Sequence, residues 1–120
     1  MKGFIKSVTY ALDGLFSALK TERNLRIHIV AMFIAIALGF YLKLSIIQWG
    51  IIILVTGFVL VAELFNTAME RLGDEAANGM QKKLVKKAKD IAAAGVLVSS
   101  ITAFTIGILF LFIPFIRSFR

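Results

Sequence analysis

Three long apolar segments dominate the chain and predict three membrane-spanning helices. They cover residues 27–42, 46–65 and 91–116. A helix that crosses the hydrocarbon core of a bilayer needs about 20 mostly apolar residues. The second and third segments meet this length, while the first needs help from its neighbours and is bounded by His28 and Lys43. We therefore expect an all-α membrane protein.

A different pattern precedes these segments, at residues 4–20. Apolar side chains recur there at helical spacing on one face, while the lysines and the aspartate lie largely elsewhere. This pattern is typical of an amphipathic helix that lies in the membrane interface. A core-facing helix of a soluble bundle would look similar, but the apolar segments that follow disfavour it. We expect all 120 residues to form one integral-membrane domain.

Composition supports lipid as the solvent. The chain is 59% hydrophobic and has a mean hydropathy of +0.88, and a soluble domain of this size cannot bury so much apolar surface. It contains no cysteine, which excludes disulfides, iron–sulfur sites and cysteine-based zinc sites. The net charge of +7 could indicate a nucleic-acid partner. With this hydropathy, we interpret it as a signal of topology and of contact with lipid headgroups, with no nucleic acid bound.

The basic residues predict the orientation in the membrane. Most of the 14 lysines and arginines lie in the N-terminal segment or between residues 71 and 89. Because basic residues concentrate on the cytoplasmic side, both regions are expected there, and the C-terminus outside. The sequence GDEAANG at 73–79 is expected to be the cytoplasmic loop, with Gly73, Asn78 and Gly79 as helix breakers.

Acidic and amide side chains follow the second apolar segment at a spacing that places them together. Glu63, Asn66, Glu70 and Asp74 share one face if the helix continues that far, because each residue turns a helix by about 100°. Glu63 lies inside the apolar segment, where an acid costs roughly 2.5 kcal/mol or more at the centre and less near the boundary. We interpret this cost as a sign of function. The alternative is a protonated or paired Glu63 that holds helices together.

Other polar residues gather on the same predicted side of the membrane. They are Glu22, Asn24, Arg26, His28, Lys89 and Asp90. Acids without histidine or cysteine partners favour hard cations such as Mg²⁺, and lysines suit phosphate. Together they fit phosphoryl transfer to a lipid better than hydrolysis or redox chemistry. The usual nucleotide motifs are absent, so an ATP site here would be unconventional.

Three short motifs resemble the small integral-membrane prokaryotic diacylglycerol kinases, a family with an undecaprenol kinase branch. They are E-x-x-x-R at Glu22–Arg26, E-x-x-N-[ST]-A-x-E at Glu63–Glu70, and A-K-D at Ala88–Asp90. The likeness extends from about Phe4 to Ile113. It implies a homotrimer of three-helix protomers in the bacterial cell membrane, each protomer with an N-terminal surface helix. It also implies active sites at the cytoplasmic interface that are shared between protomers.

The resemblance further implies a role for each polar residue. Glu63 resembles the general base that acts on the lipid hydroxyl, and Asn66 would orient groups around it. Glu22 and Glu70 resemble the ligands of the Mg²⁺ that accompanies ATP. The remaining nucleotide contacts would be Tyr10, Asp74, Lys89 and Asp90. The segment that contains Asn24, Arg26 and His28 would border the lipid.

Departures from the family pattern bear on the substrate. Lys86 and Lys87 replace a small residue and an arginine seen in the best-known diacylglycerol kinase, and the loop after residue 73 is about one residue longer. The stretch ERNLRIH at Glu22–His28 resembles the undecaprenol kinase branch. We therefore expect ATP- and Mg²⁺-dependent phosphorylation of undecaprenol, with diacylglycerol as the alternative substrate.

A hypothesis of another class is a small multimeric transporter in which Glu63 couples to an ion. Such a protein needs polar positions near the middle of the membrane. Here the polar groups cluster on one side only, which favours the kinase.

Overall fold

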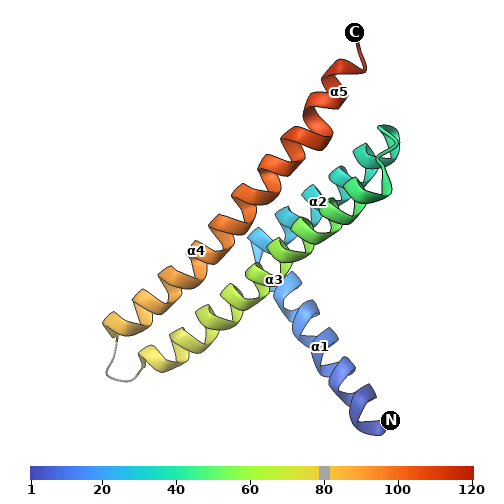
Figure 1. Cartoon of the computed structure of the whole chain (residues 1–120). Helices are drawn as coiled ribbons and strands as arrows, with labels where there is room; N and C mark the ends of the chain where they lie inside the picture. The colour runs from blue at the N-terminus through green and yellow to red at the C-terminus, as the bar shows by residue number, and fades with distance from the viewer. Residues whose placement is uncertain (79–81) are drawn as a thin grey trace.

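The computed structural model describes residues 1–78 and 82–120, which are helical almost throughout (Figure 1). The elements are α1 (Lys2–Thr21), α2 (Arg23–Tyr41), α3 (Ile46–Ala77), α4 (Lys82–Gly107), the π-helical turn η1 (Ile108–Phe112) and α5 (Ile113–Arg117). The last three form one continuous rod. Within these described residues, three helices are long and apolar enough to cross a membrane: α2, α3 and the rod Lys82–Arg117. The predicted all-α membrane fold, with one helix before three spans, is confirmed.

The helices are arranged as an antiparallel pair with two additions. Helices α3 and α4 lie side by side along most of their length, α2 packs on α3, and α1 leaves the bundle at a steep angle (Figure 1). The change of direction occurs at Glu22, whose extended backbone (φ −95°, ψ 109°) separates α1 from α2. Arg26 stabilises this corner by donating hydrogen bonds to the carbonyl oxygens of Leu19 (2.9 Å) and Lys20 (3.1 Å). These are among the carbonyls that a helix end leaves without an internal partner.

Helix α3 is longer than its apolar segment, and this corrects the expected loop at 73–79. Residues 73–77 are helical, while Gly79 lies outside the described residues. Gly73 allows close contact between two helices here. A Cβ at this position would lie 3.1 Å from the side chains of both Val85 and Lys89, so the missing side chain lets α4 approach α3 closely.

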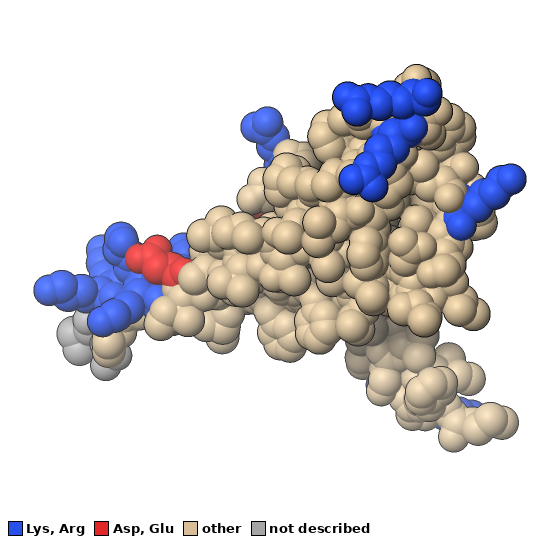
Figure 2. Space-filling model, turned by 45° about the horizontal axis from the view of Figure 1, so that its top comes forward, with Lys and Arg blue, Asp and Glu red and all other residues tan. Residues whose placement is uncertain are grey.

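The lysine-rich stretch that follows, at residues 82–89, is also helical. Helix α4 begins at Lys82, nine residues before the apolar segment that starts at Ile91. Hydropathy reports where lipid contact begins, whereas lysine is a good helix former outside the membrane as well. In the space-filling view, lysine and arginine side chains gather at this α3–α4 end of the molecule (Figure 2).

The opposite end of the α2–α3 hairpin is tightly built. Lys43 has a left-handed backbone (φ 53°), and Ser45 begins α3 with a reciprocal capping box to Gln48. Gly39 is needed beside this turn, because a Cβ there would lie 2.6 Å from the ring of Trp49.

Very little of the chain is buried within a single copy. The buried apolar side chains are Ala18, Leu25, Ile52, Val59 and Leu111. Many large apolar side chains along the spans are exposed. Lipid or other protein must cover them, because an apolar surface this extensive does not face water.

Candidate active site

The polar stripe of α3 is continuous, because the helix runs unbroken from Glu63 past Asp74. Glu63 is only 3% exposed, although it lies on the apolar part of the helix. Its Oε1 atom and the Oδ1 atom of Asn66 are buried without a hydrogen-bond donor among the described residues. A buried polar atom left unpaired costs about 1–3 kcal/mol. Two such atoms on one face mark a place that is organised for something other than stability.

The closest polar neighbour of Glu63 comes from α2. The Nε2 atom of His28 lies 3.1 Å from Glu63 Oε1. The two groups are close, but they are not aligned as a hydrogen bond. The His28 side chain is 25% exposed, whereas that of Glu63 is almost fully buried.

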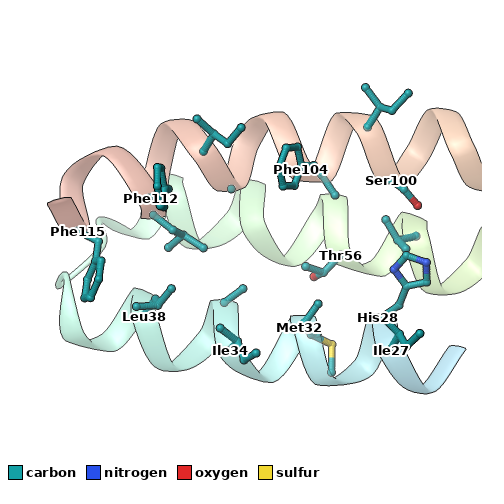
Figure 3. A pocket seen from close by; sticks show the side chains of 18 residues that line it. Ile27, His28, Met32, Ile34, Leu38, Thr56, Ser100, Phe104, Phe112 and Phe115 are labelled. Carbon is teal, nitrogen blue, oxygen red and sulfur yellow. The ribbon is translucent and has the colours of Figure 1, made fainter. Parts of the chain in front are cut away.

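An apolar groove of about 880 Å³ begins at His28 and runs between α2 and the α4–η1–α5 rod, over α3 (Figure 3). Ser100 lies near the His28 end, and Phe112 and Phe115 lie at the other end. The hydroxyl of Ser100 is buried without a hydrogen-bond partner among the described residues. The remaining lining residues are Ile27, Ala31, Met32, Ile34, Ala35, Leu38, Thr56, Val59, Ile101, Ala103, Phe104, Gly107, Ile108 and Leu111. The groove therefore has one polar end and a long apolar body.

Lys89 connects α4 to the acidic stripe. Its Nζ atom lies 2.7 Å from Asp74 Oδ1 and 2.8 Å from Glu70 Oε2. The hydrogen bonds to Asp74 and Glu70 raise the pKa of the Lys89 ammonium group above its ordinary value. Lys89 precedes the apolar segment, so a permanent positive charge lies between two carboxylates at the edge of the membrane.

Arg71 connects the same end of α3 to the corner at Glu22. Its guanidinium donates to Ser17 Oγ (3.0 Å), to the Ser17 carbonyl (3.4 Å) and to Thr21 Oγ1 (2.6 Å). Thr21 in turn donates to Glu22 Oε1 (3.0 Å), and Arg71 itself lies 3.9 Å from that atom. Arg71 directly follows Glu70, so this network ties the corner that carries Glu22 to the helix position that carries Glu70.

Other predicted site residues lie further apart. Asp90 pairs with Lys86 at 2.9 Å, and Asn24 is exposed at the start of α2. Tyr10 lies on α1, is 62% exposed and has the Lys6 ammonium 5.8 Å from its ring centroid. Helix α1, which carries Tyr10, leaves the bundle at a steep angle (Figure 1).

Two side chains were not singled out from the sequence. They are Arg71, which lies in the basic stretch of the predicted cytoplasmic side, and Ser100. The sequence contains no signal for the Arg71 contacts, because its partners are about 50 residues away.

The carboxylates fit a role as partial ligands of Mg²⁺. Among residues 1–78 and 82–120, no three histidine or acidic side chains lie close enough together to hold an ion alone. Protein sites for Mg²⁺ in phosphoryl-transfer enzymes commonly supply one or two carboxylates, and the substrate phosphates and water supply the rest. Glu22 and Glu70 are of the right chemical type for that arrangement.

Comparison with known proteins gives this site its chemical context. The family described as prokaryotic diacylglycerol kinase matches residues 9–111, which is most of the chain. The chain belongs to this family. It is thus a lipid kinase and a multi-pass membrane protein, an enzyme that transfers a phosphoryl group to a lipid. Membership decides against the transporter hypothesis.

Individual relatives of this kinase differ in their named substrates. An undecaprenol kinase of Bacillus subtilis is 39% identical over 92% of this chain and 89% of its own length. A diacylglycerol kinase of Synechocystis is 36% identical over 84% of this chain and 58% of its own length. A diacylglycerol kinase of Helicobacter pylori is 34% identical over 83% of this chain and 80% of its own length.

Proposed function

We propose that this kinase transfers the γ-phosphoryl group of Mg²⁺–ATP to the hydroxyl of undecaprenol, at the cytoplasmic face of the membrane. The observation that carries the proposal is the continuous stripe of α3. It begins at buried Glu63, beside the polar end of an apolar groove, and continues to Glu70 and Asp74, which hold Lys89. A lipid hydroxyl and a nucleotide phosphate could therefore meet along one helix face.

The shape of the groove supports a single long lipid chain. On the α4 side it extends from Ser100 to Phe115, about 22 Å at 1.5 Å per residue. Half of a hydrocarbon core of about 30 Å is about 15 Å. Both chains of diacylglycerol reside in one leaflet, whereas a polyprenyl chain can follow the groove beyond the midplane. The Bacillus subtilis relative, which is an undecaprenol kinase, supports the same choice.

Phosphoryl transfer requires positioning and neutralisation of charge more than covalent help from the protein. Glu63 serves as the base that assists loss of the hydroxyl proton, and Asn66 orients groups beside it. Lys89 and Asp74, together with Asp90 and Tyr10, bind the nucleotide. Asn24, Arg26 and His28 border the lipid.

The ion would be held by the carboxylates of Glu22 and Glu70. When bound, Mg²⁺ offsets charge on the β- and γ-phosphates. In this chain, Arg71 and Lys89 offset the charge of these two carboxylates.

The same proposal includes orientation and assembly. The N-terminus and residues 71–89 face the cytoplasm, because the basic residues gather there. The protein acts as a homotrimer with sites shared between protomers. Support comes from the apolar surface left uncovered by one copy and from Tyr10, which is exposed on the helix that leaves the bundle.

The test is a phosphotransfer assay with purified protein in detergent, labelled ATP and Mg²⁺, and either undecaprenol or diacylglycerol as acceptor. We expect label in the undecaprenol extract. Glu70→Gln should abolish turnover while the protein remains inserted, whereas the matched variant Glu75→Gln, at an exposed position of α3, should retain it. Label only in diacylglycerol would reverse the substrate assignment, and full activity of Glu70→Gln would remove Glu70 from the metal site.

A further inference from the structure

The two walls of the apolar groove carry very small residues at one level. Figure 3 shows Met32 of α2 level with Phe104 of α4. Three residues further along α2, Ala35 lines the groove, and three residues further along α4, Gly107 lines it as well. Because the two helices run in the same direction (Figure 1), Ala35 and Gly107 face each other across the groove. We call these two residues the small-residue pair.

Gly107 leaves space in the groove instead of allowing close helix contact. A Cβ at this position would have no neighbouring atom within 4 Å, whereas a Cβ at Gly39 or Gly73 would press against another side chain. Among the described residues, Gly107 is the only glycine that lines the groove. Glycine weakens the interior of a helix relative to alanine. At Gly107 this cost brings no closer packing within one copy, and its visible effect is an open groove.

The small-residue pair lies in the outer half of the membrane. Gly107 follows Ile91, where the apolar segment of α4 begins, by 16 residues, which is about 24 Å at 1.5 Å per residue. The midplane of a hydrocarbon core of about 30 Å lies about 15 Å from its edge. A helix tilt of about 40°, the upper end of the usual range, reduces the depth of Gly107 only to about 18 Å. Lipid chains that end at the midplane therefore do not reach the pair.

The groove continues beyond the small-residue pair. The π-helical turn η1 begins directly after Gly107 and contributes Ile108, Leu111 and Phe112 to the wall. Turns of this kind are frequent at functional sites. At the far end, the rings of Tyr41 and Phe115 lie 5.9 Å apart, so α2 and the rod meet there. The pair thus separates an inner part of the groove, beside the polar end, from an outer part.

We propose that Ala35 and Gly107 are specificity-determining residues, which admit an acceptor lipid whose chain continues past the midplane of the membrane. This inference rests on the proposed function and names the residues that select its substrate. Neither residue has a side chain longer than a methyl group, so a polyprenyl chain can pass between them. A larger side chain at either position closes the outer part of the groove. Diacylglycerol and short prenols occupy only the inner part, so their binding does not depend on the pair.

The first experiment is a competition between two prenols in the same detergent micelles, with undecaprenol and farnesol in equal amounts. In Gly107→Leu and in Ala35→Leu, the ratio of undecaprenyl phosphate to farnesyl phosphate should fall about 10-fold or more, because one misfitting methylene in an apolar pocket already changes specificity by about 10- to 200-fold. The loss should be in KM for undecaprenol more than in kcat, because this part of the chain is remote from the reacting atoms. Partial unfolding of a variant lowers both products equally and leaves the ratio unchanged.

Two control variants should keep the wild-type ratio. Gly107→Ala adds only a Cβ, which has open space around it. Gly57→Leu makes the same large change at an exposed glycine of α3 that does not line the groove. If the wild type does not accept farnesol, KM for undecaprenol in Gly107→Leu and Gly57→Leu decides, and equal values would contradict the proposal.

The second experiment does not require turnover. An undecaprenol analogue that carries a diazirine near the middle of its chain is irradiated with the protein, and the cross-linked peptides are mapped by mass spectrometry. In the wild type and in Gly57→Leu, cross-links should form at residues 108–115. In Gly107→Leu these cross-links should be lost, because the chain no longer enters the outer part of the groove. An unchanged pattern in Gly107→Leu would overturn the inference.

The outcomes separate the two claims. A wild type that phosphorylates undecaprenol, with Gly107→Leu and Ala35→Leu keeping its product ratio and KM, would overturn the role of the pair and leave the proposed function standing. A wild type that phosphorylates only diacylglycerol, or no lipid alcohol, would overturn both.

Discussion

Arg71 joins the end of α1 to α3 through side-chain hydrogen bonds, and the loss of these bonds should be measurable. Arg71 donates three hydrogen bonds to Ser17 and Thr21. A typical hydrogen bond contributes about 0.5–1.5 kcal/mol net. The Arg71 side chain is 46% exposed, so solvent screening lowers the total for Arg71→Gln to about 1–2 kcal/mol. Because about 1.4 kcal/mol corresponds to a factor of ten, local opening of the end of α1 should become about 5- to 30-fold more frequent.

Hydrogen exchange measures this opening directly. In Arg71→Gln, the backbone amides of residues 15–22 should exchange faster by that factor, while those in the middle of α3 should not change. In Arg71→Lys, the exchange rate of these amides should lie between the rates of the wild type and Arg71→Gln, because an ammonium group keeps the charge but lacks the planar set of donors of a guanidinium. The matched control is Arg23→Gln. Arg23 is exposed, and among residues 1–78 and 82–120 its side chain forms no hydrogen bond or ion pair. Equal exchange in Arg71→Gln and Arg23→Gln would refute the reasoning.

Two further substitutions test the ends of the bundle. Gly39→Ala should destabilise the protein by about 1–3 kcal/mol through overpacking against Trp49, partly offset by up to about 1 kcal/mol of helix propensity. The control is Gly14→Ala, because a Cβ at Gly14 would have open space around it. The measurement is thermal unfolding in detergent, and equal unfolding midpoints for the two variants would contradict the prediction. Lys89→Met should abolish phosphotransfer and weaken the α3–α4 contact, because Glu70 and Asp74 lose the cation between them. Since the folded-state pKa of Lys89 is raised, its contribution is complete below the ordinary lysine pKa of about 10.4 and is lost only as the pH rises through the raised value. Stability that falls between pH 7 and 9 in the wild type but not in Lys89→Met would therefore contradict this assignment.

Much of the fold follows from the sequence because helix periodicity and hydropathy are local properties. The three spans, the separate N-terminal helix and the face shared by Glu63, Asn66, Glu70 and Asp74 could all be predicted. Helix ends were predicted less well. Hydropathy changes where lipid contact ends, but α3 continues to Ala77 and α4 begins at Lys82, since both helices extend beyond the membrane. The family motifs supplied the expected roles of the site residues, which the proposed experiments test.

The sequence by itself determined which polar residues lie on which helix and at roughly what depth. Only the tertiary structure decided which of them meet. His28 contacts Glu63 across 35 positions, Arg71 reaches Thr21 across 50, and Lys89 lies between Glu70 and Asp74. These contacts depend on the register between neighbouring helices, which is set by packing details such as the missing side chain of Gly73. No local pattern encodes that register, because it arises from how the helix surfaces fit together.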